Sequence, residues 1–111
     1  MAGDVTRDEL QRALAGDAPP VLVEALGAAY FADAHLPGAL NIPPDRVELV
    51  APVLLPDRAA DIVVYCSGNG ASSGITAERL VALGYQRIRV YSGGKEDWVE
   101  HGLPVERAPH S

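Results

Sequence analysis

Short continuous apolar runs alternate along the chain with segments in which apolar residues recur every three or four positions. Residues 21–23 and 62–65 are the clearest runs, and such runs are typical of strands covered on both faces. Residues 39–42 and 87–91 are shorter or partly alternating, and we expect strands there too. The strongest strand prediction is 62–65, because Val and Ile dominate it.

The segments between these runs have helical spacing. Thr6 and Glu9 stand at the spacing of a capping box, and Leu10 and Leu14 then fall on one apolar face. A proline lies inside the third helical segment, at position 52, and is expected to shorten or kink that helix. This third segment spans residues 45–54, and the remaining helical segments are at 27–34, 77–84 and 95–101.

Strands that alternate with helices from start to finish predict an α/β fold, a parallel sheet covered on both sides. The 111 residues suit one domain, and 48 % of them are apolar, which is enough for a packed core. We expect the domain to span residues 5–105, with tails at 1–4 and 106–111.

Charge and cysteine content narrow the function classes. The net charge of −6, without a Lys/Arg cluster, argues against nucleic acid and anionic membranes as partners. A single cysteine excludes an intramolecular disulfide framework and fits a reducing compartment. The polar start after Met1 does not resemble a signal peptide, and no apolar run approaches membrane-spanning length, so we expect a soluble cytoplasmic protein.

That one cysteine, Cys66, is the most informative residue. It ends the apolar run 62–65 and opens a polar, glycine-rich segment that leads into a helix. A thiol at the carboxyl end of a buried strand, before a helix N-terminus, faces backbone N–H groups and a helix dipole that both favour an anion. We therefore expect Cys66 to be partly thiolate, which is the nucleophilic form.

The loop after Cys66 is the predicted anion-binding element. Its glycines let the backbone curl with N–H groups pointing inward, and its serines and asparagine add side-chain donors. The predicted binding residues are Ser67, Gly68, Asn69, Gly70, Ala71 and Ser72.

Simpler interpretations of both features exist. Cys66 could be a small buried apolar residue, although the chain turns polar at that position. The loop could be an ordinary strand–helix turn with a serine N-cap, and a capping turn can also hold an anion. It is not a phosphate-binding P-loop, because the lysine and the spacing of that motif are missing.

Other polar residues have structural interpretations. His35 precedes a Pro-Gly turn and is expected to hydrogen-bond it, while His101 ends a helix, where a cation is favoured. Trp98 is expected to pack in the core. No Cys/His/carboxylate spacing indicates a metal site, and no cofactor is predicted. Three further residues are weaker candidates, near strand ends or in the tail: Glu24, Asp33 and His110.

Three motifs together resemble the rhodanese family of single-domain sulfurtransferases over about residues 5–105. They are AHLPGA with NIP at 34–43, VVYC at 63–66, and GG through Trp98 to GLPV at 93–105. The resemblance implies a central parallel sheet of about five strands flanked by helices. It also implies that the Cys66 thiolate takes the outer sulfur of a donor, thiosulfate or a persulfide, and passes it from a Cys66 persulfide to cyanide or a thiol.

The chain departs from this family pattern in three places. The first strand ends in Glu24-Ala25-Leu26 where the family often has Asp-x-Arg, so we expect a structural ion pair to be missing. No Lys or Arg lies between Cys66 and Glu78, so we expect weak thiosulfate activity and a persulfide as the alternative donor. The cysteine loop also looks about one residue longer than in typical members.

Two other functions stay open. A non-catalytic or regulatory module would fit the cation-free loop, although such a module does not need a cysteine at that position. Phosphatase or arsenate-reductase chemistry on the same fold would need a loop arginine, which is absent here. With one cysteine, the persulfide must be resolved by an external thiol or nucleophile, so we expect a protein or small-molecule sulfur acceptor.

Overall fold

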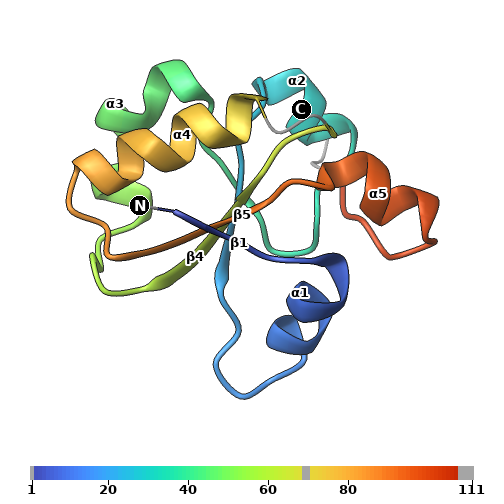
Figure 1. Cartoon of the computed structure of the whole chain (residues 1–111). Coiled ribbons are helices and arrows are strands. Elements are labelled where there is room, and N and C mark those ends of the chain that lie inside the picture. The colour runs from blue at the N-terminus through green and yellow to red at the C-terminus, as the bar shows by residue number, and fades with distance from the viewer. Residues whose placement is uncertain (1, 69–70, 108–111) are drawn as a thin grey trace.

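One parallel sheet organises the chain. The computed structural model describes residues 2–68 and 71–107, and within them five strands form a sheet of order β1-β5-β4-β2-β3, every neighbouring pair being parallel (Figure 1). The strands are β1 Gly3–Asp4, β2 Val21–Glu24, β3 Leu40–Asn41, β4 Asp61–Tyr65 and β5 Arg87–Tyr91. The predicted α/β class is confirmed.

Helices connect these strands and cover both faces of the sheet. They are α1 Arg7–Leu14, α2 Ala28–Asp33, the 3-10 turn η1 Pro44–Arg46, α3 Val47–Leu54, α4 Ala71–Ala82 and α5 Gly94–Glu100. In Figure 1, α3 and α4 lie together on one side of the strands, with α1 and α5 on the other. None of the helices in the described residues combines the length and apolarity needed to cross a bilayer.

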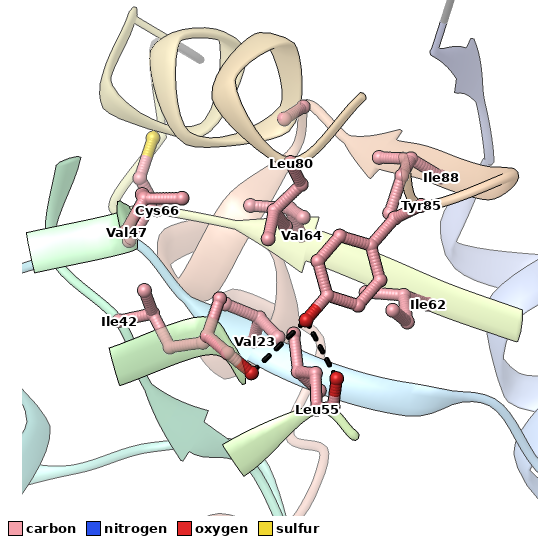
Figure 2. Packing of buried hydrophobic residues seen from close by; sticks show 13 residues of the cluster. Val23, Ile42, Val47, Leu55, Ile62, Val64, Cys66, Leu80, Tyr85 and Ile88 are labelled. Atoms are coloured by element: carbon pink, nitrogen blue, oxygen red, sulfur yellow. Dashed lines mark hydrogen bonds between the residues drawn. The ribbon is translucent and has the colours of Figure 1, made fainter. Parts of the chain in front are cut away.

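Alternation along β4 divides the core into two clusters. Ile62 and Val64 point toward α3 and α4, whereas Val63 and Tyr65 point toward α1 and α5. Because side chains of a strand alternate between faces, Cys66 joins the first cluster. Tyr85 closes that cluster, with its hydroxyl bonded to the carbonyls of Ala51 and Leu55 (Figure 2).

The structure follows the local sequence signals closely. Thr6 and Glu9 form the predicted capping box at the start of α1. Pro52 lies in the last turn of α3, which ends two residues later at Leu54. The residues around Asp45, expected to open that helix, form η1 instead, and a short 3-10 turn before a helix is a common way to enter one.

Both expected tails contain paired residues. Gly3 and Asp4 form β1 and pair with Arg89 and Val90 at the edge of the sheet. Glu106 pairs through its backbone with His35. A two-residue edge strand has no periodic pattern of its own, so the sequence carries no signal for it.

Asp97 connects three elements on the α1–α5 side. Its carboxylate accepts hydrogen bonds from the Tyr91 hydroxyl at the end of β5 and from Arg7 at the start of α1, the latter at 2.9 Å. The bond from Tyr91 and the Arg7 guanidinium hold the pKa of the Asp97 carboxyl below its usual value. Burial, and then the bond to Asp97, raises the pKa of Tyr91, so the phenol remains the donor.

Asp97→Asn should lower the free energy of unfolding at pH 7 by about 1–2 kcal/mol, since hydrogen bonds to a charged group are weakened but one oxygen stays. The folded-state pKa of Asp97 is depressed, so this stabilisation is present above the unfolded-state pKa and is lost as pH falls through the folded-state value. Urea unfolding at pH 7 and near pH 3 measures the difference, which should shrink at the lower pH. Asp8→Asn, at an exposed position on α1, is the control for the change in net charge. If the stability difference between wild type and Asp97→Asn does not change with pH, the stabilising role of the ionised Asp97 carboxylate is contradicted.

Candidate active site

Cys66 follows β4 directly and is buried, with 2 % of its surface exposed. It lies at one end of the first core cluster, away from Ile62 and Tyr85 (Figure 2). Its sulfur is 3.5 Å from the hydroxyl oxygen of Ser73, which is itself fully buried on α4. The predicted position, at the carboxyl end of a central strand and before a helix, is the one observed.

The predicted loop residues divide into two groups. Ser67 and Gly68 continue from Cys66, and Ala71 and Ser72 open the twelve-residue helix α4. Asn69 and Gly70 lie outside the described residues. The prediction that this loop is about one residue longer than in typical members falls in part on these two positions. Helix α4 therefore begins five positions after the cysteine, and the dipole at its N-terminus favours a negative charge there.

Ser73 contacts the sulfur and was absent from the predicted binding residues. A signal for it was available in the sequence, because the buried residues of α4 share one helical face that begins at Ser73. They are Ser73, Thr76, Ala77 and Leu80. The helical segment predicted at residues 77–84 reaches Ser73 when it is extended one turn toward the cysteine.

The start of α5 holds the backbone of the cysteine loop. The Lys95 N–H donates to the Cys66 carbonyl at 2.8 Å, and the Glu96 N–H donates to the Ser67 carbonyl at 2.7 Å. Gly94 makes this approach possible. Its φ is +68°, and an added Cβ would lie 2.7 Å from the carbonyl oxygens of both Cys66 and Ser67.

Gly94→Ala should therefore lower the free energy of unfolding and the reactivity of Cys66 more than the same substitution at Gly102. Gly102 has nearly the same φ, +70°, with nothing within 4 Å of an added Cβ, so Gly102→Ala measures backbone strain alone, about 1–2 kcal/mol. We expect Gly94→Ala to lose roughly a further 1–3 kcal/mol as overpacking and to slow alkylation of Cys66. Urea unfolding and iodoacetamide kinetics of both variants test this, and equal losses would show that α5 can move away from the loop at little cost.

Glu24 is fully buried at the end of β2, on the face of the sheet opposite to the first core cluster and Cys66. Its two carboxylate oxygens accept from the Tyr65 hydroxyl at 2.9 Å and from the Lys95 amine at 3.1 Å. Lys95, with a side chain 13 % exposed, also donates to the carbonyls of Tyr30 and Ala34 at the end of α2. Burial, and then the nearby Glu24 charge, raises the pKa of Tyr65, which keeps its hydroxyl a donor.

This network corrects one expectation. The loss of arginine after Glu24-Ala25 predicted a missing ion pair, whereas Glu24 is paired with Lys95. The cation comes from α5 rather than from the same strand. A buried carboxylate requires a partner, and here the fold supplies it from a position 71 residues away.

The remaining candidates have structural roles. His35 is buried, bonds the Phe31 carbonyl at 2.7 Å and stacks on the Phe31 ring, so its side chain contacts the preceding helix rather than the turn. In that turn, the Gly38 N–H donates to the Glu106 carboxylate instead. Trp98 is buried as predicted and donates to the Pro104 carbonyl at 2.7 Å.

His101 and the weaker candidate Asp33 lie outside the cysteine loop. His101 contacts Asp97 and Arg7 at the end of α5, Asp33 is exposed, and His110 lies outside the described residues. Across residues 2–68 and 71–107, no three His, Cys, Asp or Glu side chains are grouped so that they could hold a metal ion.

Comparison with known proteins agrees with this geometry. Residues 6–101 match the family described as the rhodanese-like domain. A curated sulfurtransferase of Allochromatium vinosum is 30 % identical over 105 residues, which cover 95 % of each chain. The chain belongs to the rhodanese-like family.

Solved structures show the same fold. A thiosulfate sulfurtransferase from Pseudomonas aeruginosa superposes with a TM-score of 0.83 at 30 % identity, over 95 % of this chain but only 20 % of that one. The human single-domain sulfurtransferase TSTD1 superposes with a TM-score of 0.76 at 26 % identity, over 90 % of this chain and 97 % of that one. The chain thus has the rhodanese-like fold, and proteins named sulfurtransferases are among its relatives.

Proposed function

We propose that this protein is a sulfurtransferase that carries sulfane sulfur on Cys66. The observation that carries the proposal is the position of Cys66, at the carboxyl end of β4 and before α4, in a chain of the rhodanese-like family. The donor is thiosulfate or a persulfide, and the acceptor is a thiol or cyanide.

The first half-reaction is an attack by the Cys66 thiolate on the outer sulfur of the donor. A bond forms between that sulfur and Sγ, the sulfur–sulfur bond of the donor breaks, and its electron pair leaves with sulfite or with a thiolate. An acceptor anion then attacks the terminal sulfur of the Cys66 persulfide and regenerates the thiolate. Each step exchanges one anion for another, so the cycle needs no external oxidant or reductant.

The groups around Cys66 suit an anionic donor and an anionic persulfide. We infer that backbone N–H groups of Ser67 to Ala71, with the Ser72 hydroxyl, bind them, Asn69 and Gly70 being included from the sequence alone. In the structure the Cys66 thiol donates to the Ser73 hydroxyl oxygen at 3.5 Å, and when the thiol is ionised the same hydroxyl becomes the donor to the thiolate. The N-terminus of α4 contributes a favourable dipole.

Thiosulfate should be a poor donor compared with a persulfide. The chain has no Lys or Arg from Cys66 to Glu78, and the next cation, Arg79, directs its guanidinium to the Pro44 carbonyl. A missing charge-assisted contact costs roughly 1.5–3 kcal/mol, which corresponds to about tenfold to more than a hundredfold in affinity.

Intact-protein mass spectrometry tests the proposal. The reduced, folded protein is incubated with thiosulfate and, separately, with a persulfide donor, and is then treated with cyanide or a thiol. A gain of one sulfur that cyanide removes is the expected result. No gain with either donor would contradict sulfur transfer, and assays for phosphate-ester hydrolysis and arsenate reduction would then separate oxyanion chemistry from a binding module.

A further inference from the structure

The carboxylate of Glu96 lies against the cysteine loop. A Cβ added to Gly68 would be 2.9 Å from its Oε2 and 3.0 Å from its Cδ, so the carboxylate is packed directly on the Gly68 backbone. The position is anchored by the main chain, because the Glu96 N–H donates to the Ser67 carbonyl at 2.7 Å. The side chain is exposed, and this backbone bond holds its point of attachment beside the loop.

The cations nearest Cys66 on α4 and α5 are directed elsewhere. The Lys95 amine is bonded to Glu24 on the opposite face of the sheet. The Arg79 guanidinium bonds the Pro44 carbonyl and lies 3.9 Å from Glu48. Glu96 is thus a charged side chain that the structure places on the described part of the loop, and these two cations are bonded to other groups.

From this arrangement we propose that Glu96 determines which sulfur donors Cys66 accepts, on the basis of their charge. The inference rests on the proposed sulfur transfer and specifies its substrate class. Loop N–H groups bind the reacting sulfur, while Glu96 acts on the rest of the donor. It repels the dianion thiosulfate and any acidic neighbours of a persulfide, and it attracts a persulfide flanked by lysine or arginine in a peptide or protein.

The size of the effect follows from an exposed pair of charges. Two unit charges about 4 Å apart in water interact by an energy that corresponds to about fivefold in rate, so one carboxylate should change donor rates by roughly threefold to tenfold. The effect should fall with ionic strength, since the Debye length shortens from about 30 Å at 0.01 M to about 3 Å at 1 M salt.

Matched peptide persulfides provide the test. Two persulfidated peptides of equal length, one with lysines and one with glutamates beside the cysteine, are compared with thiosulfate as donors to the full-length protein. The rate of sulfur gain on Cys66 is followed by quenched mass spectrometry for wild type, Glu96→Gln and Glu96→Lys. Glu100→Gln, which removes the same charge from the exposed end of α5, is the control.

Wild type and Glu100→Gln should both prefer the lysine peptide, by roughly threefold to tenfold. Glu96→Gln should bring the preference close to one, and Glu96→Lys should invert it and speed sulfur gain from thiosulfate. High salt should remove the wild-type preference. Sulfur gain with the same preference in all four proteins would overturn the role of Glu96 alone, whereas no gain from any donor would overturn the proposed function and this inference together.

Discussion

Lys95→Met should lower the free energy of unfolding by about 3–5 kcal/mol, because it leaves a buried carboxylate without its counter-charge. Glu24 has no exposed surface, and its Oε2 accepts from the Lys95 amine at 3.1 Å. Methionine keeps roughly the aliphatic length of lysine, so the loss reports the amine, with its pair to Glu24 and its bonds to the Tyr30 and Ala34 carbonyls, rather than a cavity. For a domain whose total stability is of the order of 5–15 kcal/mol, this is a large fraction.

The double variant Glu24→Gln/Lys95→Met should recover most of that loss. Removing both charges from a buried pair is often close to neutral, while removing one partner is costly. A glutamine at 24 can still accept the hydrogen bond from Tyr65. Urea unfolding of both single variants and the double variant gives the coupling energy between the two side chains.

The double variant also protects the test against a Lys95→Met protein that is too unstable to purify. In that case the recovery of a folded double variant is itself the predicted result. If Lys95→Met unfolds within about 1 kcal/mol of wild type, then Glu24 tolerates burial without the amine. The hydroxyl of Tyr65 and water would then have to satisfy the carboxylate.

The fold could be predicted because its determinants are local. Residues 62–65 form a continuous apolar run, and the structure buries them in β4 on both faces of the sheet. The capping box at Thr6 and the stop signal at Gly102 agree with the limits of α1 and α5 within about two residues. Helix α4, in contrast, begins at Ala71, six residues before the predicted segment 77–84. Periodicity and capping act within a few positions, so one sequence is sufficient to recognise them.

The Glu24–Lys95 pair could not be predicted in the same way. Its members are 71 residues apart, and each looks like an ordinary surface charge in its own segment. Only the order of the strands brings the end of β2 under the start of α5. The loss of arginine in the first strand was therefore misread as the loss of an ion pair.

The site itself was partly predictable. The change from apolar to polar residues at Cys66 located the thiol, since a strand end and a helix start are both visible in the pattern. Ser73 and Glu96 were missed for different reasons. Ser73 lies one turn before the predicted helical segment 77–84 and outside the predicted loop. Glu96 reaches the loop because Gly94 allows α5 to pack against it.

Cys66→Ser should abolish sulfur transfer while the protein stays folded. A serine hydroxyl cannot form the sulfur–sulfur bond that stores the transferred atom, and the chain has no second thiol to replace Cys66. We expect no cyanide-removable gain of mass from any donor, and thiocyanate formation at the rate of the uncatalysed reaction. The hydroxyl would lie beside Ser73, so the cost in stability should be about 1–2 kcal/mol.

Thermal unfolding of Cys66→Ser establishes whether the protein is folded, and the thiocyanate assay then measures transfer. Thiocyanate production near the wild-type rate from folded Cys66→Ser would contradict a cysteine-bound intermediate. Sulfur would then have to pass directly from donor to cyanide, two anions that repel each other, within a site that has Glu96 beside it. Direct transfer would need the donor and cyanide in the site together, whereas a persulfide on Cys66 lets them react one after the other.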